Sequence, residues 1–401
     1  MKAVIEKSTA VGCVKAPPSK SVLHRMLICA ALSNGESTVS NAYYSEDILA
    51  TLDCLEAMGA EIEKTQTSVT VKGFSPLDIP ENAVLPCRES GSTLRFLLPL
   101  ALLCGKRVTF TGSEKLMSRP LFVYEEICKD QNIIFEKGKN SLTVCGKLKK
   151  CEYSVPGNVS SQFITGLLFA LPFLGESKIM LTTALESKSY IDITLSVMKK
   201  YGVSANWQNA GTLYLGPEQT FKAVGMTAEG DCSSAAFLFA FNLLGGLVTV
   251  GGIESDTLQG DRVYKEYFKL LEQGAPVLDL ADCPDLAPIL MTLAAYKNGT
   301  VLKNTARLKM KESDRGEVMK EELSAFGADI TVLENEIIVK KAPLHAPDRA
   351  LCGHNDHRVV MSLAVLLSAF SGEIEGAQAA DKSFPTFFEA IKNLGIRVEL
   401  I

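Results

Sequence analysis

A pattern that recurs six times along the chain constrains its fold more than any other feature. In each copy a small polar turn opens a short, almost wholly apolar segment, and Gly or Asn-Gly closes it before a strand pattern. The clearest copy runs from Glu89 to Gly105. Successive copies open 71, 70, 73, 52 and 71 residues apart. The sequence therefore predicts six units of roughly 70 residues each. Their openings lie near Ser19, Ser90, Ser160, Ser233, Asp285 and Asp356.

Each apolar segment is predicted to be a helix that is buried on all sides, because it has no polar face. The Ser, Thr or Asp at its opening is predicted to cap the free N–H groups of the first turn. If pseudo-symmetry relates the six units, the N-termini of these helices can converge. Converging helix N-termini favour anions, so the repeats indicate a site for a negatively charged ligand.

The first unit shows the order of elements that the later units repeat. The buried helix, from Ser19 to about Leu32, is followed by a strand at Ser37–Ser40 and by an amphipathic helix at Asp47–Met58. A hairpin of Glu61–Lys64 and Ser68–Lys72 ends the unit. The fourth unit is short by about one hairpin, which accounts for the interval of 52 residues. The later amphipathic helices are expected at Leu121–Asn132, Tyr190–Tyr201, Asp261–Glu272, Asp314–Phe326 and Thr386–Asn393.

The six units form two similar halves, three before about Thr227 and three after it. The strand at Lys2–Lys7 precedes the first buried helix, so we expect it to join the later half and close a circle. An upper domain is predicted at residues 14–227 and a lower domain at residues 1–13 plus 228–401. Since ligands commonly bind between two domains, the active site is expected in the interdomain cleft.

Composition excludes several classes of protein. The chain has 41 Lys and Arg against 46 Asp and Glu, a net charge of −5, so nothing argues for nucleic acid. The eleven cysteines include no Cys-x-x-Cys pair, and no signal-peptide core is visible. This usage is typical of free thiols in a reducing cytoplasm. No apolar run reaches the ~18 residues of a membrane span.

Cations and acids gather at the predicted helix openings and in the loops beside them. Arg binds phosphate and carboxylate bidentately, so these residue types suit a substrate that carries both groups. The cations and the one amide are Lys20, Arg25, Arg95, Arg119, Gln162, Lys311, Arg315, Arg358 and Lys382, and the acids are Asp285 and Glu312.

At these positions the chain resembles the EPSP synthase (3-phosphoshikimate 1-carboxyvinyltransferase) family. The likeness covers the whole chain in the right order and therefore has far more weight than any single motif. The segments that carry it are Pro18–Arg25, Ser90–Arg95, Arg119-Pro120, Ser160–Gln162, Ser187–Asp192, Gly230–Ser234, Lys311–Arg315, Asp356–Arg358 and Lys382–Pro385.

The resemblance implies a two-domain, inside-out α/β barrel, in which each domain has three βαβαββ repeats with buried parallel helices. It also implies transfer of the enolpyruvyl group of phosphoenolpyruvate to the 5-hydroxyl of shikimate 3-phosphate, through a tetrahedral intermediate and with release of phosphate. The step serves aromatic amino acid and chorismate biosynthesis. A monomer with two small-molecule substrates and no metal or organic cofactor is expected, and glyphosate is expected to compete at Gly91.

The resemblance also implies roles for single residues. Glu312 and Lys20 are candidates for proton transfer at the methylene, and Asp285 for the hydroxyl, with the individual steps left open. The implied phosphoenolpyruvate-binding residues are Lys20, Gly91, Arg119, Gln162, Arg315, Arg358 and Lys382. The implied shikimate 3-phosphate-binding residues are Lys20, Ser21, Arg25, Ser160, Ser161, Gln162, Ser187, Asp285 and Lys311.

Two residues depart from the family pattern, since Glu89 and Arg307 both stand where Asn is frequent. Other residues have structural interpretations: Asp231, Ser233 and Asp314 could be helix caps. Cys352–His357 could suggest zinc, but Asp356-His357-Arg358 fits the sixth helix opening better, so no metal is expected.

Two other functions compete with this interpretation. The sister enzyme that acts on UDP-N-acetylglucosamine is expected to carry a catalytic Cys in the loop at Gly112–Arg119, and this loop has none. An inactive anion-binding relative would need the cations but not Asp285 and Glu312.

Overall fold

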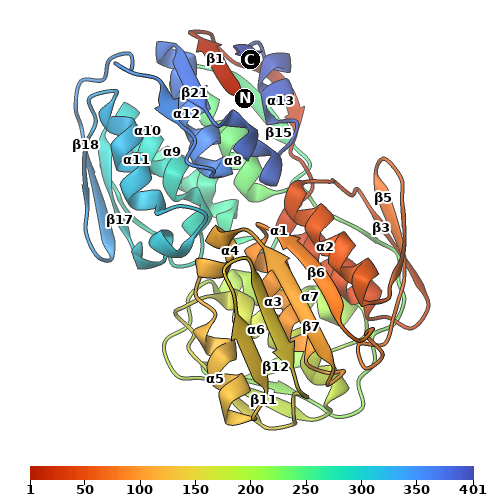
Figure 1. Cartoon of the computed structure of the whole chain (residues 1–401). Coiled ribbons are helices and arrows are strands. Elements are labelled where there is room, and N and C mark those ends of the chain that lie inside the picture. Colours follow the sequence, from red (N-terminus) through yellow and green to blue (C-terminus); the bar gives the residue numbers. More distant parts are fainter. The chain divides into compact units, whose positions relative to one another are not determined.

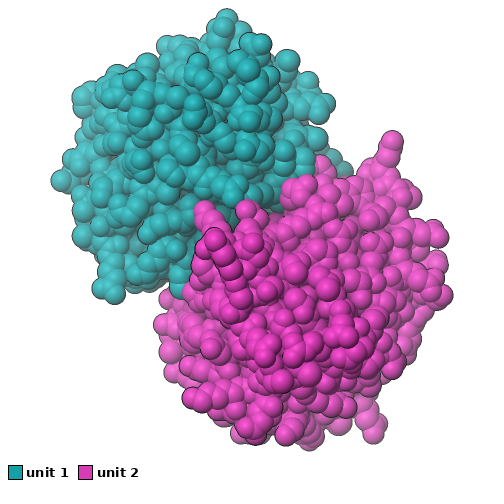
Figure 2. Space-filling view, in the orientation of Figure 1, with its two compact units in different colours: residues 1–17, 230–401 teal, residues 18–229 magenta.

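The computed structural model describes all of residues 1–401, and the chain divides into two compact units (Figure 2). Unit 1 comprises Met1–Pro17 and Gly230–Ile401, and unit 2 comprises Pro18–Glu229. Each unit is a mixed α/β structure of helices and small sheets (Figure 1). No helix combines the length and the apolar character needed to cross a membrane.

Unit 2 contains three four-stranded sheets with one common plan. In each sheet the first pair of strands is parallel and the other two pairs are antiparallel. The repeats predicted from sequence spacing are therefore repeats of structure. In strand order the sheets are β14 (Met226–Thr227), β3 (Glu36–Ser40), β5 (Ser68–Lys72), β4 (Glu61–Lys64); β6 (Ala83–Arg88), β7 (Arg107–Gly112), β9 (Ser141–Cys145), β8 (Ile134–Lys137); and β10 (Glu152–Val155), β11 (Ser177–Leu181), β13 (Thr212–Leu215), β12 (Ala205–Asn209).

Three buried helices form the core of unit 2: α1 (Lys20–Ala31), α3 (Gly91–Ala101) and α6 (Ser161–Ala170). Every residue of α1 from Val22 to Ala31 is buried, as expected for a helix without a polar face. The amphipathic helices α2 (Glu46–Met58), α5 (Phe122–Asp130) and α7 (Lys188–Lys200) bury one side only. Two short helices, α4 (Glu114–Ser118) and η1 (Leu171–Phe173), complete the unit.

Unit 1 repeats the plan with one shortened sheet. Its buried helices are α8 (Cys232–Ala240), α10 (Ala287–Tyr296) and α12 (His357–Phe370), and its amphipathic helices are α9 (Tyr264–Gln273), α11 (Arg315–Ser324) and α13 (Phe387–Asn393). The 3₁₀ turns are η2 (Phe241–Leu244), η3 (Gly260–Val263), η4 (Pro284–Leu286), η5 (Ala306–Met310) and η6 (Ala377–Lys382). In strand order the sheets are β16 (Val277–Asp279), β17 (Gly299–Lys303), β19 (Glu336–Lys340), β18 (Asp329–Val332); β20 (Leu351–Cys352), β21 (Gly372–Glu375), β1 (Lys2–Glu6), β22 (Arg397–Leu400); and β15 (Leu247–Gly251), β2 (Val11–Lys15).

The N-terminal strand β1 belongs to the sheet of unit 1 that also contains the C-terminal strand β22. β1 lies between β21 and β22 and pairs antiparallel with both, which confirms the prediction that it joins the later half. The sheet of the fourth unit has only two strands, β15 and β2. The prediction that this unit lacks a hairpin is therefore also confirmed.

Three details differ from the predictions. The fourth buried helix is capped by Asp231, and Ser233 lies inside it. Asp285 lies in η4 rather than at a cap, because Pro284 starts a 3₁₀ turn there. The side chain of Ser19 makes no capping hydrogen bond to α1. Buried helices with sheets around them fit the predicted repeat fold, but the six sheets are separate and no closed barrel of strands is present.

Candidate active site

The acids and cations predicted in unit 1 form one buried cluster around Arg315. This residue opens α11, and its side chain is 1% exposed. Its Nη1 donates to Asp285 Oδ1 at 2.8 Å, its Nη2 to Glu312 Oε2 at 2.7 Å and its Nε to Asp356 Oδ2 at 2.9 Å. Asp314 caps α11 by accepting from the N–H of Glu317, as predicted, and this cap fixes the start of the helix.

Asp285 joins the cluster to two further cations. It accepts from Lys311 Nζ at 3.3 Å and from Arg358 Nη2 at 2.8 Å. Lys382 lies near the cluster, because its Nζ donates to the carbonyl of Asn355 at 2.7 Å and Asn355 directly precedes Asp356. The structure therefore brings together six predicted site residues of unit 1. They are Asp285, Lys311, Glu312, Arg315, Arg358 and Lys382.

Burial and mutual charge shift the pKa values in this cluster. Burial by itself would lower the pKa of Arg315, but the carboxylates of Asp356, Glu312 and Asp285 raise it above its ordinary value. Burial works against ionised Asp356, yet Arg315 holds its pKa below the ordinary value. Burial lowers the pKa of Lys311 against the attraction of Asp285. Arg315 therefore favours the ionised form of Asp356, and burial makes Lys311 easier to deprotonate than an ordinary lysine.

Sequence analysis missed one carboxyl group of this region, Asp261. It is 3% exposed in η3, its Oδ2 accepts from the hydroxyl of Ser233, and its Oδ1 is buried without a hydrogen-bond partner. Burial and then the charge of Asp285 raise the pKa of Asp261 to about 7. In the sequence Asp261 had the position of an ordinary helix start, so nothing local indicated its burial.

A second group of predicted residues meets in unit 2 at the openings of α3 and α6. Gln162 accepts from Arg95 Nη1 at 2.6 Å and donates to Ser92 Oγ at 2.9 Å. A Cβ atom added to Gly91 would lie 2.5 Å from Arg119 Nη1, so Gly91 leaves the room that the guanidinium occupies. Gly91, Arg119 and Gln162 thus lie in one region, as the resemblance implied.

Other predicted site residues of unit 2 lie at the openings of α1 and α7. Lys20 Nζ donates to Asp47 Oδ2 at 2.9 Å. Arg25 donates to Thr194 Oγ1 at 2.7 Å and to the carbonyls of Ser21 and Tyr190 at 2.7 and 3.0 Å. Burial lowers the pKa of Arg25 to about 10, which leaves it charged at neutral pH.

Three serines of the predicted site also lie at helix openings of unit 2. Ser160 caps α6 by accepting from the N–H of Gln162. Ser161 is the first residue of that helix, and Ser187 precedes α7 in the left-handed region at φ 56°. Backbone strain of this kind is common at ligand sites.

The two departures from the family pattern have different settings. Arg307 is 7% exposed in η5 and donates to the carbonyl of Ala281 at 2.7 Å. Its charge also acts on Lys311 and lowers the pKa of that lysine. Glu89 is partly buried directly before the cap of α3.

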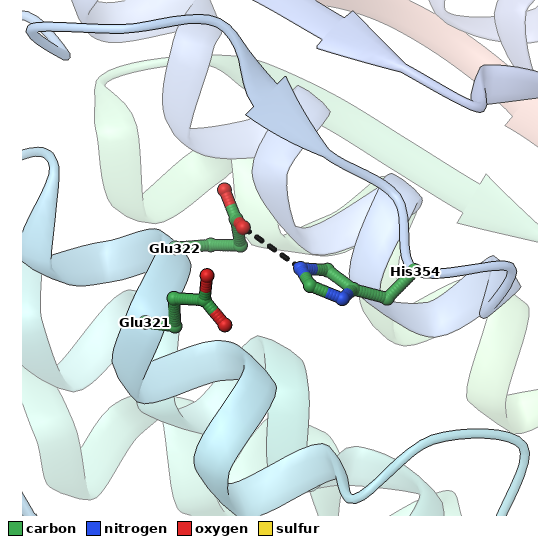
Figure 3. A group of neighbouring side chains, drawn as sticks. All are labelled: Glu321, Glu322 and His354. Atoms are coloured by element: carbon green, nitrogen blue, oxygen red, sulfur yellow. Dashed lines mark hydrogen bonds and ion pairs between the residues drawn. The ribbon is translucent and has the colours of Figure 1, made fainter.

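A group that could offer metal ligands lies beside the sixth helix opening. Glu321, Glu322 and His354 place one ligand atom each within 4.8 Å of one another (Figure 3). Glu322 already accepts from His354 Nε2 at 2.8 Å, from Arg349 Nη1 at 2.9 Å and from the N–H of Cys352 at 3.1 Å. These contacts give the buried Glu322 carboxylate three hydrogen-bond donors, one of them the guanidinium of Arg349, so its charge is compensated by the protein's own groups.

Comparisons with known proteins place the chain in one family. A family model described as EPSP synthase (3-phosphoshikimate 1-carboxyvinyltransferase) matches residues 5–391. Curated 3-phosphoshikimate 1-carboxyvinyltransferases from Clostridium kluyveri and Clostridium perfringens are 43% and 39% identical. The first match covers 97% of this chain and 96% of the relative, and the second covers 98% of both.

Solved structures agree on the fold. An EPSP synthase from Acinetobacter baumannii matches with a TM-score of 0.79 and 23% identity over 99% of both chains. The enolpyruvyl transferase NikO from Streptomyces tendae matches with a TM-score of 0.79 and 14% identity, over 99% of this chain and 98% of its own. At these identities the two structures support the fold alone.

The fold is therefore the one shared by these solved enolpyruvyl transferases. The family model and the curated relatives then make the assignment specific: the chain belongs to the EPSP synthase family. It is a transferase of the shikimate pathway that moves the enolpyruvyl group of phosphoenolpyruvate to shikimate 3-phosphate in aromatic amino acid biosynthesis. The alternative UDP-sugar acceptor is not favoured.

Proposed function

We propose that the cluster around Arg315 in unit 1 and the predicted site residues at the helix openings of unit 2 both take part in this reaction, with residues of both units serving one pair of substrates. The observation that carries the proposal is the contact of Asp285 and Glu312 with Arg315 in one buried cluster. An anion sensor needs the cations only, whereas acid–base chemistry also needs the carboxylates.

The reaction makes two chemical demands on the protein. A proton must reach the methylene of phosphoenolpyruvate so that the neighbouring carbon becomes electrophilic, and the attacking 5-hydroxyl must lose its proton. Glu312 and Lys20 serve the methylene, and Asp285 serves the hydroxyl. When the tetrahedral intermediate eliminates phosphate, the methyl group returns a proton to Glu312 or Lys20, and the departing phosphate takes up the proton that the hydroxyl released.

The cations bind the anionic groups and stabilise the charge that develops during addition. The groups for phosphoenolpyruvate are Lys20, Gly91, Arg119, Gln162, Arg315, Arg358 and Lys382, and glyphosate competes there as a mimic. Shikimate 3-phosphate is held by Lys20, Ser21, Arg25, Ser160, Ser161, Gln162, Ser187, Asp285 and Lys311. When substrate anions arrive, Arg315 and Arg358 exchange part of their contact with Asp285 for them, which frees this carboxylate to accept a proton.

The setting of the enzyme is proposed on the same footing. It acts as a monomer in the cytoplasm on two small-molecule substrates and without a cofactor. All eleven cysteines are free, which suits a reducing compartment.

Phosphate release from phosphoenolpyruvate, measured with and without shikimate 3-phosphate, tests the proposal. We expect release only with this acceptor and none with a UDP-sugar. Glu312→Gln should lower kcat by at least 100-fold, because it removes a proton-transfer group, while calorimetric binding of shikimate 3-phosphate stays within about threefold.

Glu317→Gln is the matched control. Glu317 lies on the same helix and its side chain is 53% exposed, so its removal should leave kcat unchanged. A Glu312→Gln enzyme that turns over at the parental rate would refute the assignment of Glu312.

A further inference from the structure

A continuous chain of buried side-chain hydrogen bonds crosses three helices of unit 2. It begins at His24 on α1, whose Nδ1 lies 2.8 Å from Thr51 Oγ1 on α2. Thr51 Oγ1 lies 2.7 Å from Thr93 Oγ1 on α3, and Thr93 Oγ1 donates to Ser90 Oγ at 2.7 Å. All four side chains are at most 1% exposed, so water does not compete for these bonds.

The chain has one consistent direction. Burial and then the charge of Lys20 lower the pKa of His24 well below its ordinary value, so the imidazole is neutral. With the proton on Nδ1, His24 donates to Thr51, Thr51 to Thr93 and Thr93 to Ser90. Each threonine hydroxyl then both accepts and donates a hydrogen bond, and the bonds within such a chain strengthen one another.

The chain of hydrogen bonds reaches two parts of the proposed phosphoenolpyruvate site, one through its end at Ser90 and one through its middle at Thr51. Ser90 caps α3, accepts also from the N–H of Thr93 at 3.2 Å, and immediately precedes Gly91. In the middle of the chain of hydrogen bonds, the carbonyl of Asp47 lies 3.3 Å from Thr51 Oγ1 and 3.5 Å from Thr93 Oγ1. The carboxylate of this same Asp47 accepts from Lys20 Nζ.

We propose that Thr51 and Thr93 are positioning residues for the phosphoenolpyruvate site, and that their paired hydroxyls hold the Ser90-Gly91 turn in a fixed position relative to Lys20. This inference rests on the proposed function, which places Lys20 and Gly91 at phosphoenolpyruvate. Neither threonine touches the substrate; Thr93 acts through Ser90, and Thr51 acts through α2, whose first turn contains Asp47.

The position of the Ser90-Gly91 turn relative to Arg119 has little tolerance. The space beside Gly91 is occupied by the Arg119 guanidinium, so a turn that relaxes moves against a substrate-binding cation. A displacement of about 1 Å can cost as much as 100-fold in activity. Loss of either threonine hydroxyl should therefore weaken the binding of phosphoenolpyruvate more than the binding of shikimate 3-phosphate. The serines and Arg25 that are proposed to bind shikimate 3-phosphate lie at other helix openings.

The test uses Thr93→Val and Thr51→Val in the full-length enzyme, since Val keeps the shape and removes the hydroxyl. Each variant should raise KM for phosphoenolpyruvate about tenfold and change KM for shikimate 3-phosphate less than twofold. Thr93→Ser should restore the parental value. The double variant should be no worse than either single one, because one missing hydroxyl already breaks the chain.

Thr292→Val is the matched control. Thr292 is fully buried on α10 of unit 1 and donates to the carbonyl of Pro288 at 3.0 Å, so its loss removes an equivalent buried hydroxyl elsewhere. Both KM values should stay parental in this variant. An equal rise of both KM values in Thr93→Val, or the same rise in Thr292→Val, would mean a general loss of stability and would overturn the inference.

Calorimetric titration of phosphoenolpyruvate, with shikimate 3-phosphate present, separates this inference from the proposed function. Parental enzyme that releases no phosphate would refute the proposed function. Folded Thr93→Val with parental Kd and KM for phosphoenolpyruvate would refute the positioning role alone. If Thr93→Val does not fold, Thr51→Val decides by the same readouts, with thermal denaturation as the measure of folding.

Discussion

At the scale of single residues, the cluster around Arg315 shows how the protein keeps ionised groups inside. Three carboxylates surround one guanidinium, and the guanidinium of Arg offers five N–H donors in a fixed planar fork, whereas an ammonium group offers three. Removing one partner would leave an uncompensated buried charge, which costs several kcal/mol. Asp261 is the exception, because its Oδ1 has no hydrogen-bond partner.

Asp261→Asn should stabilise the protein above neutral pH. The pKa of Asp261 is raised from 3.8 to about 7 in the fold, so the folded state binds more protons than the unfolded state between these pH values. Stability from this group is therefore lost as pH rises from about 4 to about 7. The neutral amide should remove that loss, a gain of up to about 4 kcal/mol at pH 8.

Urea denaturation at pH 5 and pH 8 measures this effect. The difference between variant and parent should be larger at pH 8, because Asp261 is mainly ionised at pH 8 and mainly protonated at pH 5. Asp231, Asp285, Arg358 and Ser233 surround the group in both proteins, so their own titration affects both alike. A difference that does not change with pH would contradict the pKa assignment.

At the scale of elements, one side chain takes the place of a missing strand. In the other five sheets a third strand pairs with the strand that follows the buried helix, but β15 pairs only with β2. Asn242 in η2 donates to the carbonyl of Val248 at 2.9 Å and accepts from its N–H at 2.6 Å. This pair of bonds covers part of the open edge, which would otherwise invite pairing with another chain. Leu247 on the same strand is 75% exposed.

Asn242→Ala should therefore promote self-association and lower the melting temperature. Two hydrogen bonds are lost and the polar groups of Val248 become available at an apolar edge, a cost of about 1 to 3 kcal/mol. Light scattering against protein concentration and thermal denaturation measure both effects. Asn206→Ala, at an exposed position of β12, is the control, and equal behaviour of the two variants would argue against edge protection.

At the scale of the whole molecule, strands from distant parts of the chain complete sheets in both units. β1 completes the sheet that holds the C-terminal strand β22. β14 near residue 227 is the first strand of the sheet that also contains β3, β5 and β4. Unit 2 is therefore one continuous segment with all its strands, whereas unit 1 needs both ends of the chain. The acids Asp285 and Glu312 belong to unit 1 only.

The segment Pro18–Glu229 expressed alone should fold cooperatively, because none of its sheets borrows a strand. It should bind shikimate 3-phosphate with reduced affinity, through Arg25 and the serines of the helix openings, and should release no phosphate from phosphoenolpyruvate. Thermal denaturation, calorimetry and a phosphate assay check these outcomes. Turnover by the isolated segment would show that Asp285 and Glu312 are not required.

The sequence by itself determined the repeat, the order of elements and the family. The spacing of apolar and capping residues is a local property, which is why the hairpin at Glu61–Lys64 and Ser68–Lys72 has the predicted bounds and why β1 and the shortened fourth unit were predictable. It also supplied the residues proposed for the site, which lie at the helix openings that the pattern marks or in the loops beside them.

Only the tertiary structure decided which charges meet and which groups lose water. Arg315 contacts carboxylates up to 41 residues away in sequence, and the chain from His24 to Ser90 joins three helices, so neither follows from local spacing. The burial of Asp261, and with it the pKa near 7, likewise depends on helices distant in sequence. Pairing and desolvation are set by packing between elements, whereas periodicity and capping are set within them.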